Sequence, residues 1–331
     1  MKTIADQYRI IREAAGWISR SGGILRFEGQ DAIPFLQALV TNDVGRLTPG
    51  EGVYAAYLTA QGRMITDLEI FHRGDVLLAA VAPGGAASLA ARLDAAIFAE
   101  DVRVSDISAE LSELFVAGGA AAVIVGRALG IDPAAVSALP ELFQLDAPDG
   151  NEAFVVRSGE APVEAFRIVA PVATRAELER RLAAQGAHPM TEALVESLRV
   201  AAGRPTFGVD MTEQTIPLEA GLLDRAISTT KGCYVGQEIV IRILHRGSGR
   251  VAKQLVTLAW TPPAMAARPA AGTSLVREGR GVGHLTSVAE SLTGDGLIGL
   301  GYVTRDTAVA GQTVTIGDDD PQVAGITGLA T

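Results

Sequence analysis

The chain of 331 residues has a single cysteine, Cys233, so it cannot form an internal disulfide bond. The same scarcity excludes zinc sites that are built from several cysteines. Long apolar runs are also missing, because the longest uncharged apolar stretch, residues 76–91, is interrupted by Pro83-Gly84-Gly85 and is too short to span a bilayer. The first 13 residues carry five charges and no apolar run, which argues against a secretory signal. We therefore expect a cytoplasmic protein with no membrane partner.

A basic excess is missing as well. Lysine and arginine total 28 against 38 aspartates and glutamates, a net charge of −10, which argues against direct nucleic-acid binding. The one Gly-x-Gly-x-x-Gly match, at residues 294–299, runs into an expected strand rather than a helix, and no phosphate loop occurs. Both observations disfavour a nucleotide-binding Rossmann domain. The residues that are present, 48% apolar and 20% charged, suffice for a sizeable core, and the length predicts about two domains.

The first 250 residues predict a mixture of strands, helices and hairpins, which is an α+β pattern. The expected strands lie at residues 24–27, 53–58, 64–71 and 75–81. The expected helices lie at residues 31–40, 86–98 and 192–202. Within the third strand Asp67 and Glu69 share one face, because side chains alternate along a strand. Thr174 and Glu177 form a capping box, which predicts the start of a further helix.

The last 80 residues or so have a different texture, with short apolar runs between turns rich in glycine and proline. Such spacing without intervening helices predicts a small antiparallel barrel. The expected strands lie at residues 251–260, 274–277, 281–287, 297–303 and 312–316.

The most informative segment is the octapeptide Lys231-Gly232-Cys233-Tyr234-Val235-Gly236-Gln237-Glu238. Cys233 follows a lysine by two residues and lies near the expected start of a helix, and both charge and helix dipole would favour its thiolate. The alternative is that Cys233 is a small buried hydrophobe. No histidine lies nearer than His245, so a Cys–His catalytic pair is not built locally. These residues leave both a reactive and a structural role open.

The octapeptide resembles the signature of the YgfZ group of folate-binding proteins, which are relatives of the glycine-cleavage T protein (GcvT). The resemblance covers nearly the whole chain. It implies a GcvT/YgfZ-like ring of intertwined α/β subdomains in residues 1–249, the second at about residues 50–145, and a C-terminal antiparallel β-barrel in residues 250–331. Other segments similar to the family occur in the family order: the Thr41-Asn42-Asp43-Val44 turn, residues 52–68, residues 199–228 with Asp210 and Pro217-Leu218-Glu219-Ala220-Gly221, and residues 281–303.

The resemblance also implies a central channel that binds tetrahydrofolate or a substituted folate. Tyr54 and Asp67 match the positions of a cavity tyrosine and a cavity acid in T proteins, and a pterin site needs a few polar groups within an apolar wall. The anionic tail of folate needs a cation, and Arg225 and Arg242 are the candidates. The octapeptide contributes the remaining predicted binding residues, Tyr234, Gln237 and Glu238.

Two positions depart from the T-protein pattern. Thr66 stands where T proteins carry the first of two adjacent acids. Ala201 stands where they carry a glutamate that holds the pterin edge. Both departures concern folate binding, because each replaces a carboxylate by a side chain without a negative charge.

Three interpretations of function follow. The first, implied by the YgfZ resemblance, is an accessory protein for iron–sulfur cluster assembly or repair that affects tRNA modification, with Cys233 as the reactive thiol and Lys231 beside it. One thiolate cannot hold a cluster alone, so we expect no resident metal and a transient contact with iron–sulfur proteins or assembly factors. The second is a folate-dependent aminomethyltransferase or demethylase of the T-protein type, with Asp67 as the positioning acid. The third is a ligand-binding or interaction module that has lost its chemistry. We expect a monomer.

Overall fold

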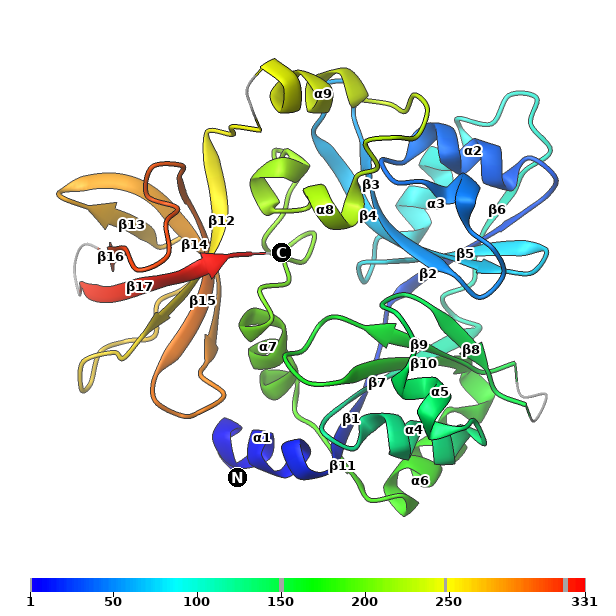
Figure 1. The fold of residues 1–331 in the computed structure, drawn as a ribbon, viewed down its shortest axis with the longest axis horizontal. Helices are drawn as coiled ribbons and strands as arrows, with labels where there is room; N and C mark the ends of the chain where they lie inside the picture. Colours follow the sequence, from blue (N-terminus) through cyan, green and yellow to red (C-terminus); the bar gives the residue numbers. More distant parts are fainter. Residues whose placement is uncertain (1, 149–151, 247–248, 318–320, 331) are drawn as a thin grey trace.

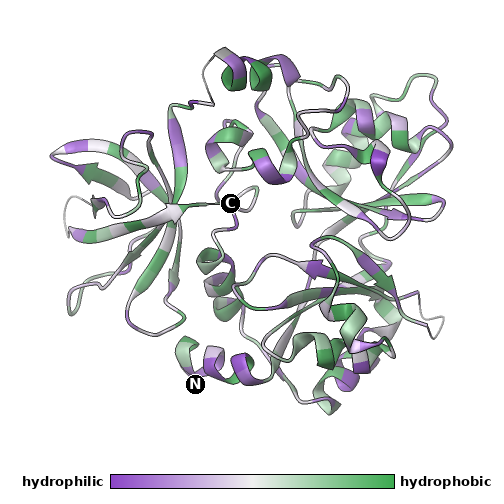
Figure 2. Ribbon diagram, viewed as in Figure 1, coloured by the Kyte–Doolittle hydropathy of each residue, from purple (hydrophilic) through white to green (hydrophobic). Residues whose placement is uncertain are grey.

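The computed structural model describes residues 2–148, 152–246, 249–317 and 321–330. Figure 1 shows three bodies around the centre of the molecule, two mixed α/β units and one barrel. The predicted α+β architecture with a C-terminal antiparallel barrel is confirmed. The division of the chain at residue 250 stays a prediction. Figure 2 shows apolar residues alternating with polar ones along the strands and helices of all three bodies.

The first body is an antiparallel five-stranded sheet with the order β3-β4-β5-β2-β6. Helices α2 and α3 pack on one face of the sheet, and Tyr54 is buried on the other face. The predicted helix 86–98 ends early, at Asp94, because the Glu100 carboxylate accepts the backbone N–H groups of Phe98 and Ala99 in a turn. The bounds are β2 Gly23–Glu28, α2 Ala32–Leu39, the 3-10 helix η1 Val44–Arg46, β3 Gly52–Leu58, β4 Met64–Arg73, β5 Val76–Val81, α3 Ala86–Asp94 and β6 Arg103–Asp106.

The second body is a six-stranded sheet with the order β11-β1-β7-β10-β9-β8, in which only the β1–β11 pair of the described strands is parallel. The predicted capping box is wrong in its contacts: α6 begins after Thr174, but the Thr174 hydroxyl donates to the Pro171 carbonyl, and Glu177 pairs with Arg181. The bounds are α1 Ile4–Glu13, β1 Ala15–Arg20, β7 Leu111–Ala117, α4 Ala121–Leu129, α5 Pro133–Ser137, β8 Gln144–Asp146, β9 Phe154–Ser158, β10 Ala165–Pro171, η2 Val172–Thr174, α6 Arg175–Ala184, β11 Ala187–Pro189 and α7 Glu192–Ala201.

The third body is a closed barrel with the order β12-β15-β14-β13-β16-β17. The five predicted strands are all present, but the strand that closes the barrel, β17, was missed because glycines interrupt its apolar alternation. The segment before the barrel contains η3 Pro217–Ala220, α8 Leu223–Ala226 and α9 Gln237–Arg246. The barrel strands are β12 Lys253–Trp260, β13 Ser274–Arg277, β14 Arg280–Glu290, β15 Leu297–Thr304, β16 Thr313–Ile316 and β17 Gln322–Leu329.

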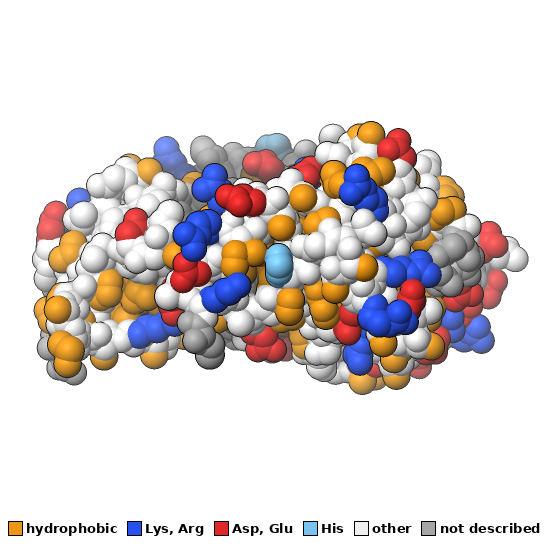
Figure 3. Space-filling view, turned by 90° about the horizontal axis from the view of Figure 1, so that it is seen from below, with side chains coloured by type: hydrophobic (Ala, Val, Ile, Leu, Met, Phe, Trp, Pro, Cys, Tyr) orange, Lys and Arg blue, Asp and Glu red, His pale blue; other side chains and the backbone are white. Residues whose placement is uncertain are grey.

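The outer surface is mixed in character. On the face seen from below, apolar side chains form small groups separated by polar and charged ones (Figure 3). Within the described residues, every helix is too short or too polar to cross a lipid bilayer.

Candidate functional site

A cavity of about 730 Å³ lies where the two sheets meet. Its walls come from β3, β4 and β5 of the first sheet, from β7 and β10 of the second, and from α7 and the segment 204–209. Leu111, Val195 and Phe207 give the wall an apolar part. Among the described residues, none of the barrel lines the cavity. Small-molecule sites span about 300–1,000 Å³, so this cavity has the size of a ligand site.

Tyr54 and Asp67 face each other inside the cavity, from β3 and β4. The Tyr54 hydroxyl donates to Asp67 Oδ2 at 2.7 Å. Burial raises the pKa of Asp67, and the hydrogen bond from Tyr54 opposes this rise. Burial and the neighbouring Asp67 charge raise the pKa of Tyr54 well above its ordinary value. Tyr54 therefore remains the proton donor, and Asp67 is a carboxylate that accepts a proton more readily than one in water.

Arg225 is held beside this pair by the turn at Thr41 and Asn42. The centre of the Arg225 guanidinium lies 4.8 Å from the centroid of the Tyr54 ring, a cation–π distance. The Asn42 side-chain amide donates to the backbone carbonyls of Tyr54 and Arg225, at 2.8 and 2.9 Å. The buried Thr41 hydroxyl donates to the Ala226 carbonyl at 2.6 Å. The turn thus joins α8 to β3 and brings three of the predicted residues to one wall.

A second group of charges connects the two sheets across the cavity. Buried Arg167 of β10 forms ion pairs with Glu69 of β4 and, at 3.6 Å, with Glu113 of β7. Arg20 pairs with Glu160 at 2.6 Å. Burial raises the pKa of Glu69, against the opposing charge of Arg167. The Arg167–Glu69 pair joins a strand of the second sheet to a strand of the first, and it therefore helps to fix the separation of the cavity walls. The Arg167–Glu113 and Arg20–Glu160 pairs lie within the second body.

Arg199 of α7 lines the cavity and is anchored from behind by buried Asp210. Arg199 Nη1 donates to Asp210 Oδ2 at 2.6 Å, and the hydroxyls of Thr286 and Ser287 donate to Oδ1 at 2.6 and 2.7 Å. The register of β14 against β15 shifts between Leu285 and Ser287. Such a bulge turns two consecutive side chains toward one partner. The barrel thereby supports the cavity wall without lining it.

Lys231 lies outside the cavity lining, against the end of α2. Its ammonium donates to the carbonyls of Gln37, Val40 and Asn42 at 2.6, 2.7 and 2.9 Å. Burial lowers the pKa of Lys231 to about 8, which still leaves the ammonium form in the majority at neutral pH. Because a lysine has three donors and all three are used, Lys231 holds the turn that positions the cavity wall. Its predicted catalytic role stays a prediction.

The same segment packs on the β3–β4 hairpin through Gly236. This residue has a φ of +83°, and a Cβ there would lie 2.5 Å from the Thr59 carbonyl oxygen. Only glycine meets both conditions without strain. The octapeptide glycine therefore permits a close approach of backbone to backbone.

The other octapeptide residues also lie outside the cavity lining. Cys233 is exposed, so its interpretation as a buried hydrophobe is wrong. Tyr234 is buried, and Gln237 begins α9. Glu238 and Arg242 form an exposed ion pair at 2.7 Å along α9. The structure thus brings together Tyr54, Asp67 and Arg225 but not these five residues. The reactive role of Cys233 and the folate contacts of the other four stay predictions.

Sequence reasoning missed several charged residues of the cavity, above all Arg167. A signal for Arg167 was present, because it is the one charge in the otherwise apolar strand β10. A charge in a buried strand requires a partner of opposite sign. Glu69 had been placed on the face of Asp67, but its partner came from the other sheet and could not be read from spacing.

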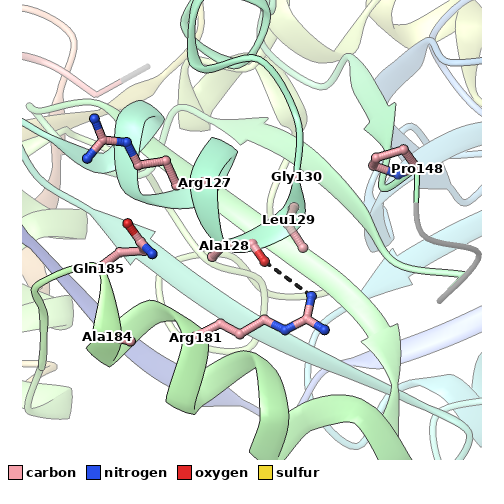
Figure 4. Close-up of a pocket in the computed structure, with 8 residues that line it drawn as sticks. All are labelled: Arg127, Ala128, Leu129, Gly130, Pro148, Arg181, Ala184 and Gln185. Carbon is pink, nitrogen blue, oxygen red and sulfur yellow. Dashed lines mark hydrogen bonds between the residues drawn. The ribbon is translucent and has the colours of Figure 1, made fainter.

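A smaller hollow of about 330 Å³ lies between α4 and α6 and shares no residue with the cavity. Arg181 Nη1 donates to the Ala128 carbonyl at 3.5 Å across this hollow (Figure 4). Arg181 also pairs with Glu177. In the part of the chain that the structure describes, no group of three or more His, Cys, Asp or Glu side chains could hold a metal ion.

Comparison with known proteins assigns a family to this architecture. Residues 1–231 match the GCVT N-terminal domain, and residues 253–325 match the glycine cleavage T-protein C-terminal barrel domain. The chain therefore belongs to the glycine cleavage T-protein (GcvT) family. The expected membership of the GcvT superfamily is confirmed, and the narrower assignment to the YgfZ group stays a prediction.

Individual relatives carry transferase names. The chain is 30% identical over 306 residues to the aminomethyltransferase of Rubrobacter xylanophilus, covering 92% of this chain and 80% of that protein. It is 28% identical over 299 residues to a putative chloroplastic transferase of Arabidopsis thaliana, covering 90% and 67%. The crystal structure of the glycine cleavage system aminomethyltransferase T from Bartonella henselae has a TM-score of 0.84 at 22% identity and covers 98% of this chain and 88% of that chain, which shows the shared fold.

Proposed function

We propose that the protein is a folate-dependent transferase of an aminomethyl or related one-carbon group, with the cavity as the folate site and Asp67 as the acid–base group. Family membership supports this proposal, as do the relatives named aminomethyltransferase. Because a fold alone does not define a reaction, one observation carries the proposal. It is the carboxylate of Asp67, which is buried in a cavity of about 730 Å³ and bonded to a tyrosine.

The residues of the cavity suit tetrahydrofolate. The apolar wall at Leu111, Val195 and Phe207 would hold the pterin and aminobenzoate rings. Arg225 supplies a cation for the anionic tail. Tetrahydrofolate supplies the nitrogen that forms a bond to the one-carbon unit, while the bond between that carbon and its donor breaks and the donor atom leaves with the bonding electron pair. Asp67, whose pKa burial raises, takes up the proton released at that nitrogen, and Tyr54 orients the Asp67 carboxylate for this step.

Although Thr66 and Ala201 depart from the T-protein pattern, another carboxylate of the cavity is available to bind the pterin edge. Thr66 and Ala201 do not line the cavity. Glu196 of α7 does, and its side chain is 40% exposed, with both oxygens also bonded to Arg199. A carboxylate oxygen has a further lone pair for a second donor. In this proposal the pterin N–H groups donate hydrogen bonds to the Glu196 carboxylate.

The test is turnover of tetrahydrofolate with methyl and aminomethyl donors, followed by mass spectrometry of the folate product. We expect the wild-type chain to form product and Asp67→Asn to lose about 100-fold or more of the rate, the usual contribution of a general acid–base group. Asp146→Asn is the matched control, because Asp146 is an exposed, ion-paired aspartate outside the cavity lining. Full turnover by Asp67→Asn excludes Asp67 as the acid–base group.

A second candidate function rests on the exposure of Cys233. We propose that the protein acts as an accessory factor for iron–sulfur proteins. In this function a partner protein reaches the Cys233 thiol from solvent, and folate binds in the separate cavity. In a deletion strain, Cys233→Ala then fails to restore iron–sulfur enzyme activity, while Asp67→Asn restores it. The opposite pattern, rescue by Cys233→Ala and none by Asp67→Asn, excludes the accessory role and favours the transferase.

A further inference from the structure

Two arginines of the cavity wall share one carboxylate. Glu141 Oε2 lies 3.1 Å from Arg204 Nη2, and Glu141 Oε1 lies 3.2 Å from Arg225 Nη2. Arg204 follows α7, Arg225 lies in α8, and Glu141 belongs to the loop between α5 and β8. Both arginines line the cavity, whereas Glu141 does not. Three separate segments therefore meet at this bridge.

The bridge carries a net positive charge, because two guanidinium groups face one carboxylate. Burial and the like charge of Arg225 lower the pKa of Arg204. The two cations repel each other, and Glu141 is the carboxylate that holds them together. A second carboxylate, from a ligand in the cavity, has the same chemistry and the same planar fit to the two guanidinium groups.

The backbone next to Glu141 has an unusual conformation. The next residue, Leu142, has a φ of +67°, a left-handed conformation that is strained for a leucine. Residues in such conformations cluster at ligand clamps and switches. On the other side, Gly159 leaves the space for Glu141, because a Cβ at that position would lie 2.6 Å from Glu141 Oε1.

Glu141 is also free to leave. Its side chain is 39% exposed, so water can solvate the carboxylate once it is released. The side chains of Arg204 and Arg225 are 16% and 24% exposed, so they depend more on a protein or ligand partner. When a ligand carboxylate replaces that of Glu141, water therefore solvates the released glutamate at little cost in free energy, and both arginines keep an anionic partner.

We infer that Glu141 occupies the binding site of a ligand carboxylate between Arg204 and Arg225 and competes with it, so that Glu141 sets the affinity for the anionic part of the ligand. The inference rests on the proposed folate site, since it assigns these arginines to the carboxylates of the folate tail. Removing the Glu141 charge then strengthens binding. A damaged fold would weaken binding, so a gain of affinity cannot be explained by misfolding of the variant.

The test measures dissociation constants by calorimetry for two probes, tetrahydrofolate and tetrahydropterin, which lacks the benzoylglutamate tail. We expect Glu141→Gln to bind tetrahydrofolate about two- to fivefold more tightly, the range given by a partly exposed ion pair. Tetrahydropterin affinity stays unchanged. Glu164→Gln is the matched control, because Glu164 is a similarly exposed partner of Arg157 and neither residue lines the cavity.

The outcomes separate this inference from the proposed function. If the wild-type chain binds tetrahydrofolate and Glu141→Gln binds it equally or more weakly, the competition is refuted and the folate site stands. An equal gain for both probes also refutes it, because the tail is then not involved. If neither protein binds either probe, both proposals fail. Glu141→Ala must shift the affinity in the same direction as Glu141→Gln.

Discussion

Tyr54→Phe removes one hydroxyl and isolates what the Tyr54 hydrogen bond does for Asp67. The bond is short, 2.7 Å, and its acceptor is a carboxylate. Hydrogen bonds to charged groups contribute about 1.5–3 kcal/mol. Because this bond favours the carboxylate form, its loss raises the pKa of Asp67, already raised by burial, still further in the variant.

The same change has a signed effect on stability. A carboxyl group whose pKa is raised by folding contributes stability below its unfolded pKa and loses it as the pH rises through the folded pKa. At a pH above the folded pKa of Asp67, the free energy of unfolding of Tyr54→Phe is therefore lower than that of the wild type by about 1.5–3 kcal/mol. The difference shrinks as the pH falls through the pKa values of Asp67 in the two folded proteins, because Asp67 is then protonated in both.

The assay is a titration of the carboxyl carbon of Asp67 by NMR, in aspartate-labelled wild type and variant. Tyr57→Phe is the control, because Tyr57 lies on the same strand but is buried in the core under α2 and α3. We expect the Asp67 midpoint to rise in Tyr54→Phe and to stay in place in Tyr57→Phe. An unmoved or lowered midpoint in Tyr54→Phe refutes the electrostatic account of this pair.

Three further predictions concern the surroundings of the cavity. Lys231→Met leaves three carbonyls without a donor, and we expect it to lower the free energy of unfolding by about 2–4 kcal/mol. Urea titration measures this loss, and an unchanged midpoint contradicts the structural role of Lys231. Arg167→Met leaves the half-buried Glu69 without its ion-pair partner and lowers the free energy of unfolding by about 3–5 kcal/mol. Glu69→Leu combined with Arg167→Met costs less, and equal losses speak against a coupled pair. Cys233→Ala changes the free energy of unfolding by less than about 0.5 kcal/mol, because the side chain is exposed, and leaves tetrahydrofolate affinity unchanged; a loss of affinity would place the thiol in the folate site.

Local patterns predicted the strands around the site well. Alternation at residues 53–58 and 64–71 identified β3 and β4, and Tyr54 and Asp67 do meet in the cavity. Their meeting depends on a hairpin, which is a local structure, and on the family resemblance that singled out these two positions. The pairing of neighbouring strands is the kind of contact that sequence periodicity can predict.

Contacts between distant segments could not be predicted in this way. Arg167 pairs with Glu69 of the other sheet, and Asp210 accepts hydrogen bonds from Thr286 and Ser287 at a bulge in the barrel. A bulge changes which face a side chain occupies, and alternation alone does not show where it occurs. Glu141 was also missed, because an exposed loop glutamate has no pattern that marks it as a partner of two cavity arginines.

The octapeptide shows how a strong motif can mislead about placement. The resemblance implied folate contacts for Tyr234, Gln237 and Glu238 and a catalytic role for Lys231, and these roles stay predictions. In the structure Lys231 bonds to the end of α2, and Gly236 contacts the hairpin at Thr59. The motif is therefore close to the cavity through the turn that it supports, and it does not line the cavity itself. Whether Cys233 reacts is a separate question from folate binding.

The central claim, that the cavity at Asp67 is a folate site, is tested most directly by calorimetric titration of the full chain with tetrahydrofolate. The account predicts saturable binding at one site per chain, with affinity weakened in Arg225→Gln and unchanged in Arg242→Gln, since Arg225 lines the cavity and Arg242 lies on the exposed face of α9. An absence of binding heat at several temperatures, or binding weakened by Arg242→Gln alone, would contradict it.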